Sequence, residues 1–399
     1  MFWVGIDVSK DSHSIAFLGA SGELLRDVFE VSNDSAGFGL LEVASRSLSA
    51  SPSDFLFCME STGRYWKNLH RFLVSKGFPV CVVNPSRVAA FRRASDARNA
   101  KTDTADALAI ARFACAFDLV APSAPDREGL KRLTRFRASL VKERTQLKNR
   151  LAASVSEVFP ALPALLGGTS SASFAAVVSA YPTSELLASA DPCELFCILS
   201  TASRGRYKRD KVPALIAAAK ENCGSCDPCL VFEFQQLVQM ITFYSDKISA
   251  VDREIAELSA CPERVLLSSI PGIGVYGAAV ILAETGDPSR FPAAKSLMAF
   301  AGMDATVVQS GHYVGKDAHM TKRGSSYLRY ILMMCADAAR RSDPYFGDYY
   351  KALRERGKHH YVAVSACARK LCGVILAVLR EQRPYERREP VSSRKPSAV

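Results

Sequence analysis

The fold of this chain is decided first by residues 2–10, FWVGIDVSK, where an apolar run typical of a β-strand reaches an acid at Asp7. A second apolar run, FLFCM at residues 55–59, ends at Glu60, and PVCVVN at residues 79–84 predicts a further strand. An acid beside such runs lies close to a buried region, where an unpaired charge is costly. We therefore expect Asp7 and Glu60 at the tips of core strands, as candidate functional carboxylates.

Two further acids open a predicted helix, KTDTADALAIARF at residues 101–113. Asp103 and Asp106 are three positions apart, so their side chains share one helix face. Acids at such positions often only cap a helix and favour its dipole, and the spacing alone leaves that interpretation open. If all four acids converge, cations must offset their mutual repulsion, and carboxylate oxygens are ligands that Mg²⁺ prefers. Convergence would therefore predict a two-metal Mg²⁺ centre.

Four blocks of the sequence carry a resemblance to a known family: GIDVSK at residues 5–10, MESTGRYW at 59–66, VVNPSRVAAFRRA at 82–94 and AKTDTADALAIARF at 100–113. They resemble the DEDD insertion-sequence transposases of the "IS one-ten" family, in the family's order. The resemblance implies an α/β RNase H-like (RuvC-like) N-terminal domain. It also implies that the DEDD set, which binds Mg²⁺, consists of Asp7, Glu60, Asp103 and Asp106.

The chain has 399 residues and a formal net charge of +11, which is unevenly placed. Residues 121–150 hold nine basic and three acidic side chains, and the C-terminal third is also basic. This favours a polyanionic partner, although a basic face is often only solvated surface. We expect nucleic-acid contacts from a set of cations and turn glycines: Arg92, Arg93, Lys101, Lys131, Arg135, Lys142, Lys148, Gly272, Gly274, Lys322, Arg323 and Arg329.

The N-terminal apolar stretch is interrupted by Asp7, Lys10 and Asp11, so we predict no secretory signal. No uninterrupted apolar run reaches 18 residues. We therefore expect a soluble protein of the bacterial cytoplasm, associated with the nucleoid when it acts.

One cysteine cluster, CGSCDPC, has the spacing of a metal site. Cys223, Cys226 and Cys229 could hold a structural zinc, with Cys261 as a fourth ligand. No second CxxC pair or nearby histidine completes the set, so reduced thiols remain the alternative.

The middle of the chain predicts long helices. Apolar residues alternate in steps of four and three from Leu230 to Leu258, which is a heptad pattern, and an earlier helix covers about residues 131–159. The two could pack as an antiparallel coiled-coil hairpin or pair between subunits. Residues 160–225 predict an insertion of short helices and loops. We expect four parts: residues 1–125, a helical region at 126–262, a mainly α transposase domain at 263–380 and a basic tail at 381–399.

In the C-terminal third, PGIG at residues 271–274 predicts the turn of a helix-hairpin-helix, whose glycines let backbone N–H groups approach a phosphate. Ser310 lies in a Gln-Ser-Gly turn, and by residue type alone such a serine is usually only a turn residue. The stretch from Ile270 to about Ala339 resembles the family's second domain, in which the serine of this motif is the nucleophile. The resemblance thus implies Ser310, with Ser325 and Ser326 as weaker candidates.

The family resemblance further implies a DNA recombinase that forms a phosphoserine link and is directed by a noncoding guide (bridge) RNA to donor and target DNA. Strand exchange also predicts a homo-oligomer, either a dimer or a tetramer. Three alternatives stay open at this stage. The first is a RuvC-like junction nuclease that uses water; the second is an actin-like ATPase or sugar kinase, because GIDVSK also resembles a phosphate strand; the third is a non-catalytic scaffold.

Overall fold

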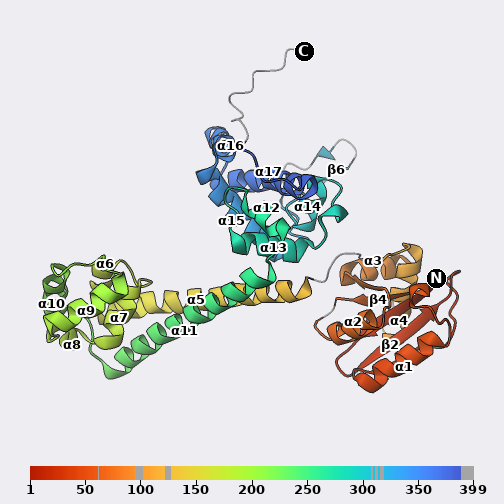
Figure 1. Ribbon diagram of the computed structural model, residues 1–399, viewed down its shortest axis with the longest axis horizontal. Helices are drawn as coiled ribbons and strands as arrows, with labels where there is room; N and C mark the ends of the chain where they lie inside the picture. Colours follow the sequence, from red (N-terminus) through yellow and green to blue (C-terminus); the bar gives the residue numbers. More distant parts are fainter. Residues whose placement is uncertain are drawn as a thin grey trace, which may run out of the picture. The chain divides into compact units, whose positions relative to one another are not determined.

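The computed structural model describes residues 1–61, 63–95, 102–121, 127–306 and 319–387, together with the backbone of residues 309–310 and 313–314. The chain divides into two compact units, Met1–Ala124 and Pro125–Val399 (Figure 1). The division within the second unit, at residue 262, stays a prediction.

Unit 1 is built on a five-stranded mixed sheet with the order β3-β2-β1-β4-β5. The central strand, β1 (Phe2–Val8), pairs antiparallel with β2 (Ser12–Leu18) and parallel with β4 (Phe55–Glu60). The outer strands are β3 (Phe29–Ser32) and β5 (Val80–Val83). The helical elements are α1 (Ser35–Arg46), η1 (Pro52–Asp54), α2 (Trp66–Ser75), α3 (Pro85–Ser95) and α4 (Asp103–Ala116). This mixed α/β arrangement is compatible with the predicted RNase H-like class.

Both faces of this sheet are covered, which explains why its strands read as nearly continuous apolar runs. Val4 and Ile6 of β1 belong to a core that includes Leu41 of α1. Trp3 belongs to a second core, which includes Ile110 of α4. Successive β1 residues therefore face opposite helical layers.

Unit 2 contains two 31-residue helices, α5 (Glu128–Val158) and α11 (Pro228–Leu258), which lie side by side (Figure 1). Two ion pairs join them: Arg137 pairs with Asp252, and Arg150 pairs with Glu233. Residue numbers therefore rise along α5 as they fall along α11. The pair is therefore antiparallel. The predicted heptad seam forms a hairpin within one chain.

The segment between these helices folds into five short helices, as its composition predicted. Their core includes Phe174, which packs edge-on against Phe234 of α11 at a centroid distance of 6.2 Å. The helices are α6 (Leu162–Leu166), α7 (Ala172–Ala180), α8 (Ser184–Ala188), α9 (Pro192–Ser203) and α10 (Lys211–Lys220).

The rest of unit 2 is mainly helical. It comprises α12 (Pro262–Ser268), α13 (Val275–Thr285), η2 (Pro288–Arg290), α14 (Ala294–Phe300), the short strands β6 (Gln309–Ser310) and β7 (Tyr313–Val314), α15 (Ser326–Ser342), α16 (Pro344–Glu355) and α17 (His360–Glu381). Among the described residues, α17 alone has the length and hydropathy of a membrane span, but 72% of its most apolar window is buried. Its apolar residues belong to the core of this unit.

Candidate functional site

Asp7 and Glu60 lie on neighbouring strands at the same end of the sheet. The parallel register of β1 and β4 pairs Ile6 with Met59, and each acid is the next residue along its strand. Gly5 and Cys58, two positions before the acids, face α4, so the alternation of strand side chains turns both acids toward the α4 face as well. Both are half-buried. The sequence prediction that these acids occupy strand tips is confirmed.

The N-terminus of α4 lies toward the same end of the sheet. A Cβ atom on Gly5 would lie 2.2 Å from the carbonyl oxygen of Ala107 and 2.4 Å from the nitrogen of Ala111, so α4 packs directly on β1. The other half of α4 lies near Gly22, where the Sγ atom of Cys115 would be 3.8 Å from an added Cβ. Gly22 follows the end of β2. That end of β2 pairs with the first residues of β1, so Gly22 marks the end of the sheet opposite to Asp7. The helix thus brings its first turn toward the end that carries Asp7.

The two acids of α4 differ in their surroundings. Thr102 caps the helix by accepting a hydrogen bond from the Ala105 backbone at 3.2 Å, and Asp103 is exposed beside it. Asp106 is half-buried and forms an ion pair with Arg92 of α3. Arg92, which we expected on a nucleic-acid phosphate, is therefore engaged by a predicted metal ligand.

The chemistry of these donors fits a hard divalent cation, because all four offer carboxylate oxygens at one end of the sheet. However, the described part of the chain contains no group of three or more histidine, cysteine or acidic residues arranged to hold a metal ion. The structure thus places Asp7 and Glu60 at the ends of adjacent strands and brings the first turn of α4 toward them. It does not gather all four acids into one cluster.

The predicted zinc site is not supported. Cys223, Cys226 and Cys229 are free and exposed, and within the described ranges they form no metal-binding group. Cys261 is half-buried at the start of α12, where it packs against the core of unit 2. Residue spacing suggested a cluster, but spacing along the chain does not ensure that the thiols converge in space.

Two of the arginines that we expect to contact nucleic acid also have partners within unit 2. Arg135 donates to both carboxylate oxygens of Glu284, at 2.7 and 2.9 Å, and Glu284 is only 4% exposed. Arg329 donates to the backbone oxygen of Ala301 at 3.0 Å. Both contacts fix elements of unit 2, and the role of these two residues in nucleic-acid binding stays a prediction.

The two glycines of the PGIG turn have different surroundings. Gly272 has a φ of +90°, and an added Cβ would lie 2.5 Å from the backbone nitrogen of Ala339, so its role is close packing against α15. Gly274 caps α13, is exposed, and has open space where a Cβ would stand. Gly274 is therefore the more accessible of the two glycines, and the phosphate contact stays a prediction for both.

The remaining predicted contacts are all lysines or arginines. Arg93, Lys142, Lys322 and Arg323 are exposed, and Lys131 and Lys148 are half-buried. Burial and the neighbouring Arg144 lower the pKa of Lys148. Lys101 lies outside the described residues.

The candidate serines have distinct environments. The backbone of Ser310 ends β6 and pairs with Tyr313 of β7, while its side chain lies outside the described part. Ser325 caps α15 by accepting from the Leu328 backbone at 3.1 Å, and its hydroxyl donates to Glu284 at 2.8 Å. Ser326 is exposed at the start of α15. The structural task of Ser325 weakens its candidacy as the nucleophile.

Comparisons with known proteins match both ends of the chain. A DEDD transposase model for IS110, described as "Transposase", matches residues 4–160, and a model described as "Transposase IS116/IS110/IS902 family" matches residues 264–351. The chain belongs to the IS110 family of DEDD insertion-sequence transposases. It is a DNA transposase or recombinase enzyme. The first match contains the four acids, and the second contains Gly272, Gly274 and Ser310.

Relatives align over nearly the whole chain. The Insertion element IS116 44.8 kDa protein of Streptomyces clavuligerus is 27% identical over 98% of this chain and 97% of its own length. The pilin gene-inverting protein of Moraxella bovis is 24% identical over 97% of this chain and 98% of its own. The Insertion element IS110 43.6 kDa protein of Streptomyces coelicolor is 35% identical, over 39% of this chain and 38% of its own.

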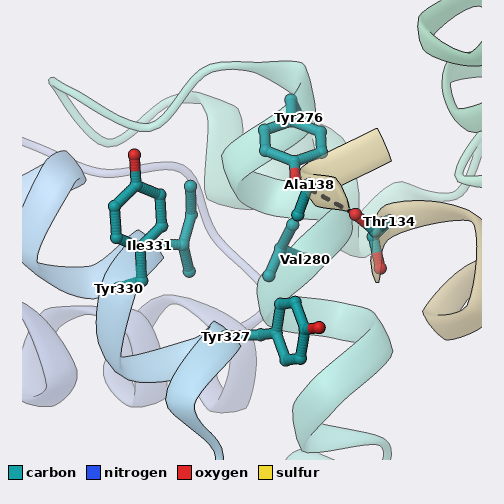
Figure 2. A pocket seen from close by; sticks show the side chains of 7 residues that line it. All are labelled: Thr134, Ala138, Tyr276, Val280, Tyr327, Tyr330 and Ile331. Carbon is teal, nitrogen blue, oxygen red and sulfur yellow. Dashed lines mark hydrogen bonds between the residues drawn. The ribbon is translucent and has the colours of Figure 1, made fainter. Parts of the chain in front are cut away.

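In this IS110-family transposase, one surface feature escaped the sequence analysis. A cavity of about 20 Å³ in unit 2 is rimmed by three tyrosines, Tyr276, Tyr327 and Tyr330 (Figure 2). The other lining residues are Thr134, Ala138, Val280 and Ile331. The available signal was the spacing of Tyr327 and Tyr330 on α15, which places two aromatic rings on one helix face.

Proposed function

We propose that this IS110-family transposase cuts and rejoins DNA through a phosphoserine intermediate on Ser310, with Mg²⁺ held by Asp7, Glu60, Asp103 and Asp106. The observation that carries the proposal is the placement of Asp7 and Glu60. They lie on one face at the ends of adjacent parallel strands, and the first turn of α4 is brought to the same end. We further propose that unit 1 is an RNase H-like domain.

The chemistry is a transesterification. The hydroxyl oxygen of Ser310 attacks a DNA phosphorus; a serine oxygen–phosphorus bond forms, and the bond from phosphorus to a sugar oxygen breaks. The serine proton passes to a base or water, and the departing sugar oxygen gains a proton. Because the number of phosphate ester bonds is unchanged, a sugar hydroxyl of another strand can reverse the step. Mg²⁺ would supply stabilisation of the charge that develops on the phosphate oxygens.

The reaction needs several strands to be held together, so we propose a homo-oligomer, a dimer or a tetramer, acting in the bacterial cytoplasm. We also propose a guide RNA that pairs with donor and target DNA. The exposed cations Arg93, Lys142, Lys322 and Arg323 support binding to phosphates, which RNA and DNA share. If recombination persists unchanged without the RNA, this part of the proposal is wrong.

The experiment compares wild type, Asp7→Ala and Ser310→Ala, each incubated with Mg²⁺, guide RNA, and donor and target DNA. We expect a covalent protein–DNA adduct and a joined product with wild type only. Ser326→Ala is the matched control, because Ser326 is an exposed serine in the same unit, and it should retain both products. Cleavage without any adduct in wild type would overturn the serine step. If Ser310→Ala still cuts DNA while Asp7→Ala does not, a junction nuclease that uses water explains the protein better.

A further inference from the structure

The tyrosine-rimmed cavity has the features of a binding surface for an aromatic ligand. Tyr330 is 63% exposed and Tyr327 is 38% exposed, although large aromatic side chains are usually covered. Met334, one turn further along α15, is 50% exposed and extends the same face. An apolar stripe of this kind on a charged protein marks a contact site for a partner.

Two of the three rings, those of Tyr276 and Tyr327, are held in place by their surroundings. The Tyr276 hydroxyl donates to the backbone oxygen of Thr134 at 3.2 Å (Figure 2). The guanidinium of Arg137 lies 4.1 Å from the centre of the Tyr276 ring. The guanidinium of Arg135 lies 4.8 Å from the centre of the Tyr327 ring. Ordered rings lose little side-chain entropy when a planar ligand stacks on them. The surface is therefore prepared for stacking.

The charge beside the cavity favours a polyanion. Lys131 and Lys142 of α5 are eleven positions apart, close to a whole number of helical turns, so both lie on the same helix face. Ala138, which lines the cavity, lies between them on that face. The two lysines are about 16 Å apart along the helix axis. The nearby carboxylate of Glu284 is paired with Arg135, so the two together add no net negative charge beside the lysines. A chain of phosphates can thus pass beside the three rings.

We propose that the surface formed by Tyr276, Tyr327 and Tyr330 binds an unpaired nucleotide, whose base stacks on the exposed tyrosines while neighbouring phosphates contact Lys131 and Lys142. Stacking recognises the flat face that every base presents, so it suits a bulge or a single-stranded junction and does not require a particular sequence. This inference rests on the proposed function, because it assumes that nucleic acid is the ligand of unit 2. The nucleotide comes from either RNA or DNA.

The test uses the full-length protein and four fluorescently labelled probes: an RNA hairpin and a DNA duplex, each fully paired or with one unpaired nucleotide. We expect wild type to prefer the bulged probe in at least one of the two pairs, and that pair identifies the source of the nucleotide. Tyr330→Ala should reduce this preference about 5- to 150-fold, which converts from the ~1–3 kcal/mol of stacking per base. Tyr330→Phe should retain it, because stacking uses the ring. Tyr361→Ala is the matched control, since Tyr361 is a 69% exposed tyrosine elsewhere in unit 2.

A second measurement does not depend on the stability of any variant. A probe with 5-iodouracil at the unpaired position, irradiated on wild type, should crosslink to the peptide that contains Tyr327 and Tyr330. Crosslinks confined to other peptides, or a bulge preference that Tyr330→Ala retains, would overturn the inference. The inference would also be overturned if Tyr330→Ala changed the number of subunits in the protein and left nucleic-acid binding unchanged. The tyrosines would then contact another copy of the chain. If wild type forms the DNA adduct but shows no bulge preference, the inference fails alone; if it binds none of the probes, the proposed function fails with it.

Discussion

The contact between Arg135 and Glu284 predicts that Arg135→Ala will destabilise unit 2 strongly at neutral pH. Glu284 is 4% exposed and accepts two hydrogen bonds from Arg135 and one from the Ser325 hydroxyl. Removing the guanidinium leaves a buried carboxylate with only the serine as its side-chain hydrogen-bond donor among the described residues. Such a charge is far less stable than it would be in water.

The magnitude follows from the burial of the pair. Breaking a buried ion pair by removing one partner costs about 3–5 kcal/mol of unfolding free energy. The Arg135 side chain is 41% exposed, so water can partly replace it, and we expect a loss near the lower end, about 3 kcal/mol. The matched control is Lys142→Ala on the same helix. Lys142 is exposed, so its removal should change the free energy of unfolding by less than about 0.5 kcal/mol.

The effect should depend on pH with a definite sign. Burial alone raises the pKa of Glu284, but the hydrogen bonds from Arg135 and Ser325 outweigh burial and hold the pKa below its ordinary value. In wild type this group therefore stabilises the fold above the unfolded pKa of about 4.3, and the contribution is lost as the pH falls through the folded pKa. In Arg135→Ala burial dominates and the pKa rises, so the variant loses stability as the pH rises. The difference between the two proteins is largest near neutral pH and shrinks in acid.

Urea unfolding at pH 7 and at about pH 4 measures this difference. Far-UV circular dichroism follows mainly unit 2, which holds most of the helical residues, whereas both tryptophans, Trp3 and Trp66, lie in unit 1 and report on that unit. We expect the helical transition to shift and the tryptophan transition to stay. A second substitution, Glu284→Gln, should restore stability to Arg135→Ala at pH 7, because it removes the unpaired charge. A loss below 0.5 kcal/mol, or an equal loss at both pH values, would refute the reasoning.

Three further predictions concern the candidate sites. Gly5→Ala should lower the unfolding free energy of unit 1 by about 1–3 kcal/mol, because the added Cβ meets the α4 backbone. Tryptophan fluorescence follows the unfolding of this unit. The control is Gly39→Ala in α1, where an added Cβ meets open space, and it should not lower the unfolding free energy. Ser325→Ala should lose about 1 kcal/mol of stability with the helix cap and still form the DNA adduct on Ser310, so loss of the adduct would point to Ser325 instead. Lys142→Ala should weaken RNA and DNA binding without sequence preference and reduce the slope of log affinity against log salt by about one, as filter binding at several salt concentrations would show.

Local patterns in the sequence were sufficient to predict much of the fold. Strands ending near Asp7 and Glu60 follow from apolar runs that stop at an acid, and both are observed. The apolar spacing in α11 identified its buried side, because buried positions such as Phe234 and Ile241 recur at heptad intervals. These features depend on neighbours within a few residues, so the sequence displays them directly.

The partners of the charged residues could not be predicted in the same way. Arg92 meets Asp106 fourteen positions away, and Arg135 meets Glu284 across 149 positions. A sequence shows that a cation is present but not which carboxylate the fold brings to it. For this reason Arg135 was predicted to contact nucleic acid on charge alone, whereas the structure shows that its guanidinium also pairs with the buried Glu284.

The spacing within the acid set depends on a residue that carries no charge. Gly5 lets the α4 backbone rest directly on β1, and Asp7 follows two positions later on the same face of the strand. A side chain at this position would push α4 away from the sheet, and with it Asp103 and Asp106, while Asp7 and Glu60 would remain fixed by strand pairing. The proposed metal site requires carboxylates from both elements within a few ångströms, so the packing of this glycine against α4 sets the distance between the two pairs of acids.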